Sequence, residues 1–331
     1  MSPKPLSRIY AFLCFLFFML SCSSTQPTLE AANPVSISWF ARKHGFVMKT
    51  KGAIDNLDKN DISMSFEANS RKLIFNGTLV WLNDPVKTWR GRRVLSQRDI
   101  DKTIMPLLDD SLLLGRRGYK TVVLDAGHGG SDNGATGRRN VQEKRVTLDI
   151  AKRTRTILEK HGINVRMTRS EDKSMTLNNR TELLATWKPD VFVSIHLNAA
   201  QSTTASGIET HITPPRGCAI TANSKVFDRD LVQYQNNIYD EGNMSLGYLI
   251  QRELIRHLKL VDRGLRRSRF FVTRNAPCPA VLVECGFLSN PAEEEKFLAA
   301  EFRQSAAEAI AAGIIAYFDE TKSRATHRVR K

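Results

Sequence analysis

Paired cysteines and long apolar runs are both scarce in this sequence, and each shortage counts against a class of protein. After Cys22 the chain has only Cys218, Cys278 and Cys285, and no two of these show CxxC spacing. Three thiols cannot all pair, so the sequence gives little support for a disulfide framework and less for a cysteine metal site, and their pairing stays open. The apolar run over residues 9–20 is too short to span a bilayer comfortably.

Basic residues outnumber acidic ones by 49 to 34, which gives a formal net charge of +15 at pH 7. Such an excess points to an anionic partner, such as nucleic acid, anionic lipid or a wall polymer, or it serves solubility alone. With 41% apolar and 25% charged residues, the chain otherwise has the composition of a folded protein with ample core. Its 331 residues favour one large and one small domain.

The amino terminus predicts export. Lys4 and Arg8 precede the apolar run and small residues follow it, which is the order of a secretory signal peptide over residues 1–22. The order MLSC is also similar to a bacterial lipoprotein processing site, with Cys22 as the acylated residue and Met19 as a departure from the usual aliphatic residue. Export to the periplasm or cell envelope argues against a nucleic-acid partner, and membrane anchoring through Cys22 stays open.

A small strand-rich α+β domain is expected over residues 35–114, after a Ser-, Thr- and Pro-rich tether over residues 23–34. Apolar residues alternate in ISMSFEA, KLIFNGTLVWL predicts a hairpin that turns at Asn76-Gly77, and Ser96 is placed to cap a helix. This order of elements resembles the N-terminal-type domain of copper amine oxidases, a non-catalytic module. The segment has no cluster of His or Cys, so the resemblance implies no copper.

Beyond a Gly-Arg-Arg-Gly break at residues 115–118, strand and helix patterns alternate. Strands are expected in TVVLDA, INVRMTR, DVFVSIH and AVLVECGF. Helices are expected in EKRVTLDIAKRTRTILEKHG, TLNNRTELLATW, SLGYLIQRELIRHL and one long amphipathic segment over residues 291–318. The alternation predicts an α/β domain over residues 120–318, with a mostly parallel sheet flanked by helices on both faces. A basic tail over residues 319–331 is expected to be solvated and disordered.

Four imidazole or acidic side chains stand at the ends of these patterns. His128 follows TVVLDA, Glu143 opens the first helix, His196 ends DVFVSI and Glu284 ends AVLV. Ligands of open α/β sheets bind outside the carboxyl ends of the strands, so the four are expected to converge at one edge. Catalytic zinc typically takes three protein ligands and leaves a position for water. His128, Glu143 and His196 fit that set, and Glu284 remains for proton transfer.

Taken singly, each of these residues has a structural interpretation. A histidine at a strand end is commonly a hydrogen-bonded structural residue, and Glu143 complements the dipole of its helix. A buried carboxylate such as Glu284 needs a partner or a metal. The glycine-rich GHGGSDNGATG lacks the Lys-Ser/Thr of a phosphate-binding P-loop.

Five motifs, DAGHGGSDNGATG, the Glu-Lys that opens a helix, TR…NNR, SIHLNA and VECGFLSN, occur in the order and spacing of a known family. Through them, residues 120–318 resemble the zinc-dependent N-acetylmuramoyl-L-alanine amidases of the type-3 family. These enzymes cut the amide between the lactyl group of muramic acid and L-alanine in bacterial peptidoglycan. The resemblance implies one zinc ion held by His128, Glu143 and His196, with Glu284 as the catalytic carboxylate.

Two departures from the family pattern leave the proposed ligands untouched: Ala126, where many relatives have proline, and Cys285. Two other functions stay open. One is a zinc peptidase that cleaves within the stem peptide, because the same chemistry serves any amide. The other is a catalytically inactive wall-binding protein, against which the presence of all four site residues argues.

Other polar residues near these motifs have two interpretations each. Asp125 is placed either to orient His128 or to cap a turn. Asn198 is placed either to touch substrate or to hold the turn after its strand. Arg169 and Arg180 are candidates for binding stem-peptide carboxylates, or belong to the generally basic surface.

Residues 214–243 form a longer region between a strand and a helix pattern. Relatives whose activity is switched by partner proteins carry a helix near this place that occludes the zinc. The segment here is short for such an insertion, although VFDRDLVQYQNNIY has the length of one helix. We therefore expect weak or absent self-inhibition, and a regulatory protein partner stays an open alternative.

Overall fold

The computed structural model describes residues 34–109, 120–223 and 225–327. The elements of the first range are β1 (Val35–Ser36), α1 (Ile37–His44), β2 (Val47–Lys51), β3 (Ile54–Lys59), β4 (Ile62–Glu67), β5 (Lys72–Phe75), β6 (Thr78–Trp81), β7 (Lys87–Trp89), β8 (Arg92–Leu95), α2 (Gln97–Asp99), a π-helical turn (Ile100–Ile104) and α3 (Met105–Leu108).

The elements of the later ranges are β9 (Thr121–Ala126), α4 (Glu143–Lys160), β10 (Asn164–Met167), α5 (Leu177–Trp187), β11 (Val191–Asn198), β12 (Ile208–Ile212), two 3-10 turns (Asp228–Asp230 and Gln235–Tyr239), α6 (Asp240–Leu258), β13 (Asp262–Arg267), α7 (Phe271–Arg274), β14 (Ala280–Phe287), α8 (Pro291–Leu298) and α9 (Ala300–His327). The strands β9, β10, β11 and β14 and the helices α4, α5 and α6 were all predicted from the sequence.

The amino-terminal strands follow the predicted patterns. Met64 and Phe66 of β4 are buried, as the alternation in ISMSFEA requires. The hairpin of β5 and β6 turns at Asn76 and Gly77, which both have positive φ as a tight hairpin turn needs. The Ser96 side chain accepts a hydrogen bond from the backbone of the third residue of α2, so the predicted cap is confirmed.

The main sheet has 11 strands in the order β10-β9-β11-β14-β12-β13-β6-β5-β4-β3-β2. Strands β10, β9, β11 and β14 run parallel to one another. Strand β12 is antiparallel to β14, and β13 is parallel to β12. The carboxyl end of β14 therefore lies beside the amino end of β12 and at the same edge of the sheet as the amino end of β13, and this arrangement matters for the site.

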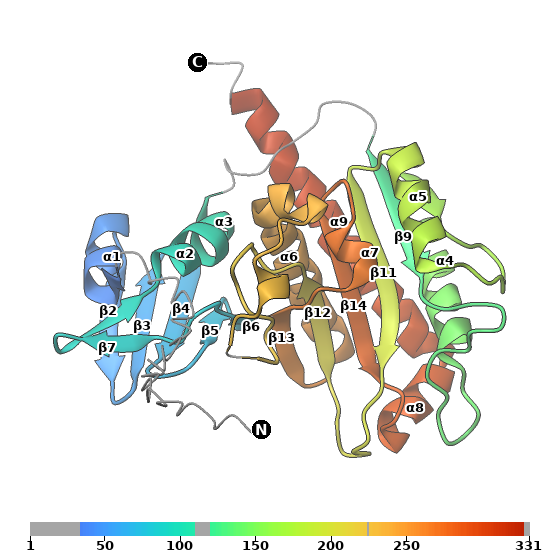
Figure 1. The fold of residues 1–331 in the computed structure, drawn as a ribbon, viewed down its shortest axis with the longest axis horizontal. Helices are drawn as coiled ribbons and strands as arrows, with labels where there is room; N and C mark the ends of the chain where they lie inside the picture. The colour runs from blue at the N-terminus through green and yellow to red at the C-terminus, as the bar shows by residue number, and fades with distance from the viewer. Residues whose placement is uncertain (1–33, 110–119, 224, 328–331) are drawn as a thin grey trace, which may run out of the picture. The chain divides into compact units, whose positions relative to one another are not determined.

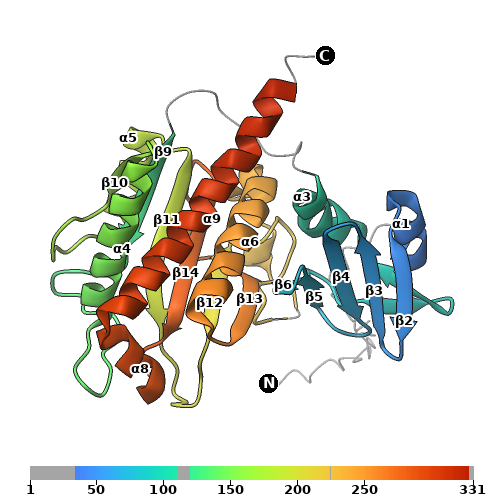
Figure 2. The ribbon, with the colours of Figure 1, turned by 180° about the vertical axis from the view of Figure 1, so that it is seen from behind.

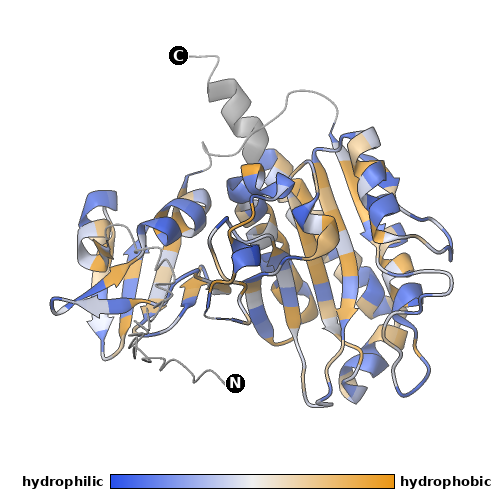
Figure 3. Cartoon of the chain, in the orientation of Figure 1, coloured by the Kyte–Doolittle hydropathy of each residue, from blue (hydrophilic) through white to orange (hydrophobic). Residues whose placement is uncertain are grey.

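Helices cover both faces of the parallel strands, as predicted. Helices α5 and α7 lie on the face seen in Figure 1, and α4, α6 and α9 on the face seen in Figure 2. Val122 and Leu124 of β9 are buried in the larger core with α4, α6 and α9, whereas Val123 packs with Leu184 of α5 and Val272 of α7. Strands buried on both faces read as continuous apolar runs, which the hydropathy colours of Figure 3 show.

The amino-terminal strands continue the same sheet. Strand β6 pairs in parallel with β13 through Val80 and Leu265, and the Trp81 indole donates a hydrogen bond to the Arg263 carbonyl at 2.9 Å. The boundary predicted at residues 115–118 lies outside the described residues. The domain limits over residues 35–114 and 120–318 therefore stay predictions.

The carboxyl-terminal segment is not the single helix expected over residues 291–318. The chain breaks between α8 and α9 at Ala299, whose backbone is extended with ψ of 129°. No glycine or proline stands at the break, which is why the sequence pattern ran through it. Helix α9 then continues to His327, well into the tail that was expected to be disordered.

Two further segments differ from expectation. Strand β13 was not predicted, because the sequence DRGLRR has the composition of a loop. The stretch VFDRDLVQYQNNIY contains the two 3-10 turns rather than one helix. No helix within the described ranges is both long enough and apolar enough to cross a membrane.

Gly313 of α9 allows the close approach of α6. A Cβ at this position would lie 2.6 Å from the Cα of Ile250. We expect Gly313→Ala to lower the free energy of unfolding by about 1–3 kcal/mol, because overpacking outweighs the gain in helix propensity. Thermal unfolding followed by circular dichroism measures the change. Ala312→Gly, one residue earlier, gives the ordinary propensity difference for comparison, and a Gly313→Ala protein with a raised Tm would contradict the packing argument.

Candidate metal centre

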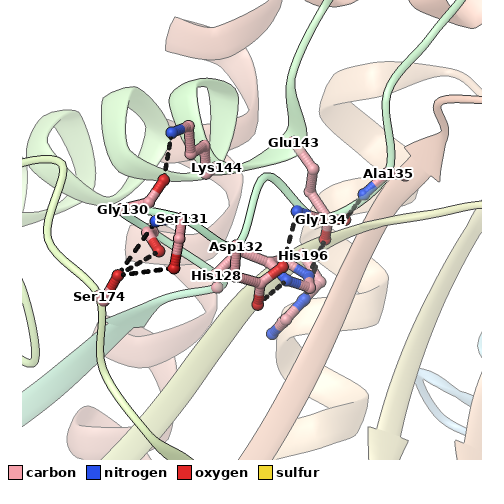
Figure 4. A network of polar contacts seen from close by, with 12 residues as sticks. His128, Gly130, Ser131, Asp132, Gly134, Ala135, Glu143, Lys144, Ser174 and His196 are labelled. Atoms are coloured by element: carbon pink, nitrogen blue, oxygen red, sulfur yellow. Dashed lines mark hydrogen bonds and ion pairs between the residues drawn. The ribbon is translucent and has the colours of Figure 1, made fainter.

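Three side chains converge at the carboxyl edge of the parallel strands. His128 follows β9, Glu143 is the first residue of α4, and His196 lies near the end of β11 (Figure 4). Their ligand atoms all lie within 4.8 Å of one another. Glu143 Oε1 lies 3.1 Å from His128 Nε2 and 2.9 Å from His196 Nδ1. The three residues expected to converge from their positions at strand ends and a helix start thus lie together in the fold.

Asp132 fixes the ring of His128 from its other side. Asp132 Oδ2 lies 2.8 Å from His128 Nδ1, so Nδ1 donates to the carboxylate and Nε2 points at Glu143 Oε1. A lone pair and a carboxylate oxygen at 3.1 Å repel each other unless a proton or a metal ion lies between them. The donor atoms are therefore arranged around a place for a cation.

The pKa values of His128 and Glu143 are also consistent with a place for a cation. Burial lowers the pKa of His128, but hydrogen bonds with Glu143 and Asp132 outweigh this effect and raise the pKa above its ordinary value. Burial likewise opposes ionisation of Glu143, yet the imidazoles of His128 and His196 hold the pKa of Glu143 well below its usual range. Glu143 is therefore a carboxylate at any physiological pH.

The carboxylate of Glu143 is held by the backbone as well as by the imidazoles. Its Oε2 accepts a hydrogen bond from the Ala135 N–H at 2.8 Å, and its Oε1 accepts one from the Leu197 N–H at 3.0 Å. The Glu143 side chain is only 4% exposed, whereas the His128 side chain is 25% exposed. The centre thus has the buried carboxylate of Glu143 held in place at its base, and it is open to solvent on the side of His128.

Glu284 lies on β14 directly beside His196, because these two residues are paired across the parallel strands β11 and β14. Its side chain is buried, and its Oε2 has no hydrogen-bond partner among the described residues. Burial, together with the charges of Glu143 and Glu209, raises the pKa of Glu284 well above its ordinary value. A buried carboxyl oxygen without a partner at this edge is suited to act on a bound molecule.

Asp125 does not orient the ring of His128, which was one of its two interpretations. Its carboxylate lies inside the sheet, where it accepts hydrogen bonds from the hydroxyls of Thr168 at 2.6 Å and Ser194 at 2.7 Å. The orienting carboxylate is Asp132, which sequence reasoning missed. Its position four residues after His128 in the glycine-rich motif was the available signal, because metal-binding imidazoles commonly pair with a nearby carboxylate.

Arg169 and Arg180 are buried and donate to main-chain carbonyls. Arg180 forms an ion pair with Asp125 and donates to the His128 carbonyl at 2.7 Å, and Arg169 donates to the Gly127 carbonyl at 2.7 Å. These bonds hold the backbone at His128, whose φ of 62° is sparsely populated by residues other than glycine. Since both arginines are only 3% exposed, neither of their two interpretations fits: they are not placed to bind stem-peptide carboxylates, and they do not belong to the basic surface.

Asn198 matches its structural interpretation. Its Oδ1 accepts a hydrogen bond from the Ala199 N–H at 2.8 Å, which holds the turn after β11. Cys22, the lipidation candidate, lies outside the described residues.

The loop between His128 and Glu143 is braced by the segment that follows β10. Lys144 Nζ donates to the Gly130 carbonyl at 2.6 Å and lies 2.9 Å from Asp172, which itself accepts from the Gly130 N–H at 2.7 Å. Ser174 Oγ accepts from the Ser131 N–H at 3.0 Å (Figure 4). These contacts were not predicted, because they join residues whose proximity only the folded chain creates.

The described part of residues 214–243 lies at the opposite end of β14 from Glu284. Asn236 donates to the Cys278 carbonyl at 2.8 Å, and Asn243 accepts from the Ala280 N–H at 2.8 Å, where β14 begins. These two residues therefore brace the start of the strand rather than the end that carries Glu284.

Comparison with known proteins gives a consistent family. Residues 122–316 match the model of Amidase_3, described as N-acetylmuramoyl-L-alanine amidase. The N-acetylmuramoyl-L-alanine amidase AmiA of Escherichia coli strain K12 is 34% identical over 236 residues, which cover 65% of this chain and 81% of that protein. The sporulation-specific N-acetylmuramoyl-L-alanine amidase of Bacillus subtilis strain 168 is 34% identical over 213 residues, covering 63% and 73%.

Solved structures agree with these relatives. The N-acetylmuramoyl-L-alanine amidase from Clostridium difficile 630 is 34% identical, with a TM-score of 0.52 and coverage of 61% of this chain and 97% of that one. The CwlD amidase from Clostridioides difficile, solved in complex with the GerS lipoprotein, is 29% identical, with a TM-score of 0.51 and coverage of 61% and 99%. The chain belongs to the Amidase_3 family of N-acetylmuramoyl-L-alanine amidases.

Proposed function

We propose that this protein is an exported, zinc-dependent amidase that hydrolyses the bond between the lactyl group of N-acetylmuramic acid and L-alanine in peptidoglycan. The observation that carries the proposal is the convergence of two imidazole nitrogens, from His128 and His196, on Glu143 Oε1 beside the buried Glu284. Membership of the amidase family supports the substrate and the class of bond.

The residues present fit a zinc ion. Two imidazoles and one carboxylate are a recurrent catalytic zinc set, and at metal–ligand distances of about 2.0–2.2 Å such atoms lie roughly 3.3 Å apart. The observed separations of 3.1 and 2.9 Å are close to this value. Two glycines keep the space open, since a Cβ on Gly127 would lie 2.4 Å from His196 Cε1, and one on Gly134 would lie 2.5 Å from Glu143 Oε2.

When bound there, zinc supplies a Lewis acid that lowers the pKa of water to about 7. Glu284 carries out the proton transfer. Its Oε2, without a partner among the described residues, accepts the proton of the attacking water and passes it to the alanine nitrogen as the amide breaks. The raised pKa of Glu284 suits the second part of this role, the donation of a proton to the alanine nitrogen, because an amide nitrogen leaves poorly unless it receives a proton.

Asp132 and Glu143 orient the imidazoles of His128 and His196 for metal binding. Asp132 keeps the proton of His128 on Nδ1, and Glu143 draws both rings toward one point. Since these contacts exist in the folded chain itself, little reorganisation is needed when the metal and substrate bind.

The setting we propose is the periplasm or cell envelope. The net charge of +15 supports contact with anionic wall polymers. One related enzyme, CwlD, has been solved with a lipoprotein partner, so a regulatory partner is part of the proposal. Because Asn236 and Asn243 hold their segment to the start of β14, away from Glu284, we expect this chain to be active without an activator, so that such a partner would adjust its activity rather than switch it on.

Glu284 and His196 separate catalysis from metal binding. We expect Glu284→Gln to lower kcat by about 100-fold or more while the protein keeps one zinc ion per chain, because Glu284 lies outside the ligand group. His196→Ala is expected to lose both zinc and activity. Metal analysis and digestion of purified peptidoglycan, before and after chelation and zinc return, measure the two effects.

Product masses decide which bond is cut. The wild-type protein, with no added partner, is expected to leave a free lactyl carboxylate on muramic acid and release peptides that begin with L-alanine. Peptides cut internally would instead show a stem-peptide peptidase. A Glu284→Gln protein that digests peptidoglycan at the wild-type rate would contradict the assigned role.

Gly127 tests the space that the metal ligands need. Because a Cβ there would overlap the His196 ring, we expect Gly127→Ala to weaken zinc binding by about 10- to 100-fold. Competition with a zinc-binding dye measures the affinity. Gly162→Ala is the control: its φ of 71° disfavours alanine and costs some stability, but nothing lies within 4 Å of the added Cβ, so the variant is expected to bind zinc normally. Equal affinity in both variants would count against the site.

Cys22 tests the lipid anchor separately from export. Acylation of this residue predicts that the wild-type protein sediments with membranes and that Cys22→Ser moves it to the soluble periplasmic fraction. Cell fractionation with immunoblotting gives the answer. A wild-type protein found wholly in the soluble fraction would remove the anchor and leave export in place.

A further inference from the structure

A second group of charged side chains lies on the same face of the sheet as the metal ligands, and the proposed chemistry does not use it. The strand register gives its position. His196 of β11 is paired with Glu284 of β14, and Glu284 is paired in turn with Glu209 of β12. Paired residues on neighbouring strands point to the same face, so Glu209 continues the row that begins at the metal ligand.

Glu209 is a buried carboxylate with several cationic neighbours. Arg263 Nε donates to Glu209 Oε1, Arg266 Nε lies 3.6 Å from Oε2, and His211 Nε2 lies 2.9 Å from Oε2. Burial opposes ionisation, but contacts with His211 and the two arginines lower the pKa of Glu209 to about 2. Burial lowers the pKa of His211, which favours its neutral form. One negative charge therefore faces two guanidinium groups, and the group is net positive.

A second carboxyl near Arg263 does not remove this excess. Both oxygens of Glu293, on α8, accept backbone hydrogen bonds, from the Gly207 N–H at 2.8 Å and from the Phe287 N–H at 2.6 Å. Burial also raises the pKa of Glu293, which weakens its negative charge. The side chain ties α8 to the strand ends rather than neutralising Arg263.

Arg263 is the exposed member of this group. It sits at an irregularity of the β12–β13 pairing, where Ile208 is opposite Asp262 and Glu209 is opposite Gly264, so that Arg263 is an extra residue. Such a bulge redirects a side chain, and bulges are frequent beside active sites. The Arg263 side chain is 34% exposed, whereas that of Arg266 is 18% exposed and sits over the Trp81 ring.

The guanidinium of Arg263 is held in place but not saturated. Its Cζ lies 4.8 Å from the centroid of the Phe287 ring, which supports one face, and its Nε is bonded to Glu209. Its Nη1 and Nη2 make no hydrogen bond to the described residues. A planar guanidinium with two unused donors on one side is the arrangement that binds a carboxylate.

The spacing suits the proposed substrate. Strand β13 lies two strands from β14, which corresponds to about 10 Å between the backbones that carry Arg263 and Glu284. The stem-peptide residue after L-alanine carries a carboxylate five bonds from the nitrogen of the cut amide, roughly 6 Å away in an extended chain. The long arginine side chain covers the remaining distance.

We propose that Arg263 binds the carboxylate of the stem-peptide residue that follows L-alanine, with Glu209 and Phe287 as positioning residues. The proposal rests on the amidase function above and specifies how that site selects its peptide. It transfers to Arg263 the contact that the sequence had suggested for Arg169 and Arg180, both of which are used inside the fold.

The test compares two soluble substrates that differ by one charge, N-acetylmuramoyl-L-alanyl-D-isoglutamyl-L-lysine and the amidated N-acetylmuramoyl-L-alanyl-D-isoglutaminyl-L-lysine, in both of which the γ-carboxyl is used in the next peptide bond. We expect Arg263→Gln to lower kcat/KM for the carboxylate substrate by about 10- to 100-fold, chiefly through KM, and for the amidated one by less than about threefold. Arg155→Gln removes another arginine paired with a glutamate, Glu159 at 2.8 Å, on the surface of α4. It is the matched control and is expected to change neither value.

Binding supplies a readout that does not depend on turnover. Calorimetric titration of both compounds into zinc-loaded Glu284→Gln protein, with and without Arg263→Gln, should show weaker binding of the carboxylate compound only. Equal losses for the two compounds would show a merely structural role and overturn the proposal, as would no loss for either. A wild-type protein that hydrolyses neither compound nor peptidoglycan would instead overturn the amidase function itself.

Discussion

The site depends on a buried group of charges beneath the end of β9. Asp125 and Arg180 form an ion pair there with Arg169 beside them, and the two arginines donate to the carbonyls of residues 126–128. Taking such charges out of water is costly unless hydrogen bonds satisfy them, and here the main chain provides those bonds. The backbone of His128 is thereby fixed in the left-handed conformation from which its ring reaches the other ligands. Charge burial stabilises the geometry in which the three candidate ligands converge.

Much of the site could be predicted because polar residues interrupt apolar runs at informative places. His196 and Glu284 come at the ends of buried strands, and parallel pairing of β11 with β14 places them side by side whatever the intervening loops do. The spacing of apolar residues likewise predicted α4, and so placed Glu143 at a helix start. Each of these inferences uses a local pattern, which a single sequence contains in full.

The remaining features depend on contacts that a single sequence does not show. Strand β13 carries four charged residues in six positions, and only partners from distant segments make it a buried strand. The break at Ala299 has no glycine or proline from which it could be predicted. Arg169 and Arg263 have the same chemistry, yet one donates to carbonyls inside the fold and the other faces solvent. The two arginines differ in the residues that surround them, and those residues come together only in the tertiary structure.

The reversal of strand direction between β14 and β12 has a consequence for how such an enzyme can change over time. It brings the loops over residues 199–207 and 259–261 to the edge that carries Glu284, although neither loop contains a residue of the metal-ligand group. Insertions or exchanges in these loops can reshape the peptide-binding rim while the hydrolytic machinery stays intact. With Arg263 in the role proposed above, peptide selectivity and hydrolysis lie on separately adjustable parts of one surface, and lineages facing different cell walls can diversify the first without changing the second.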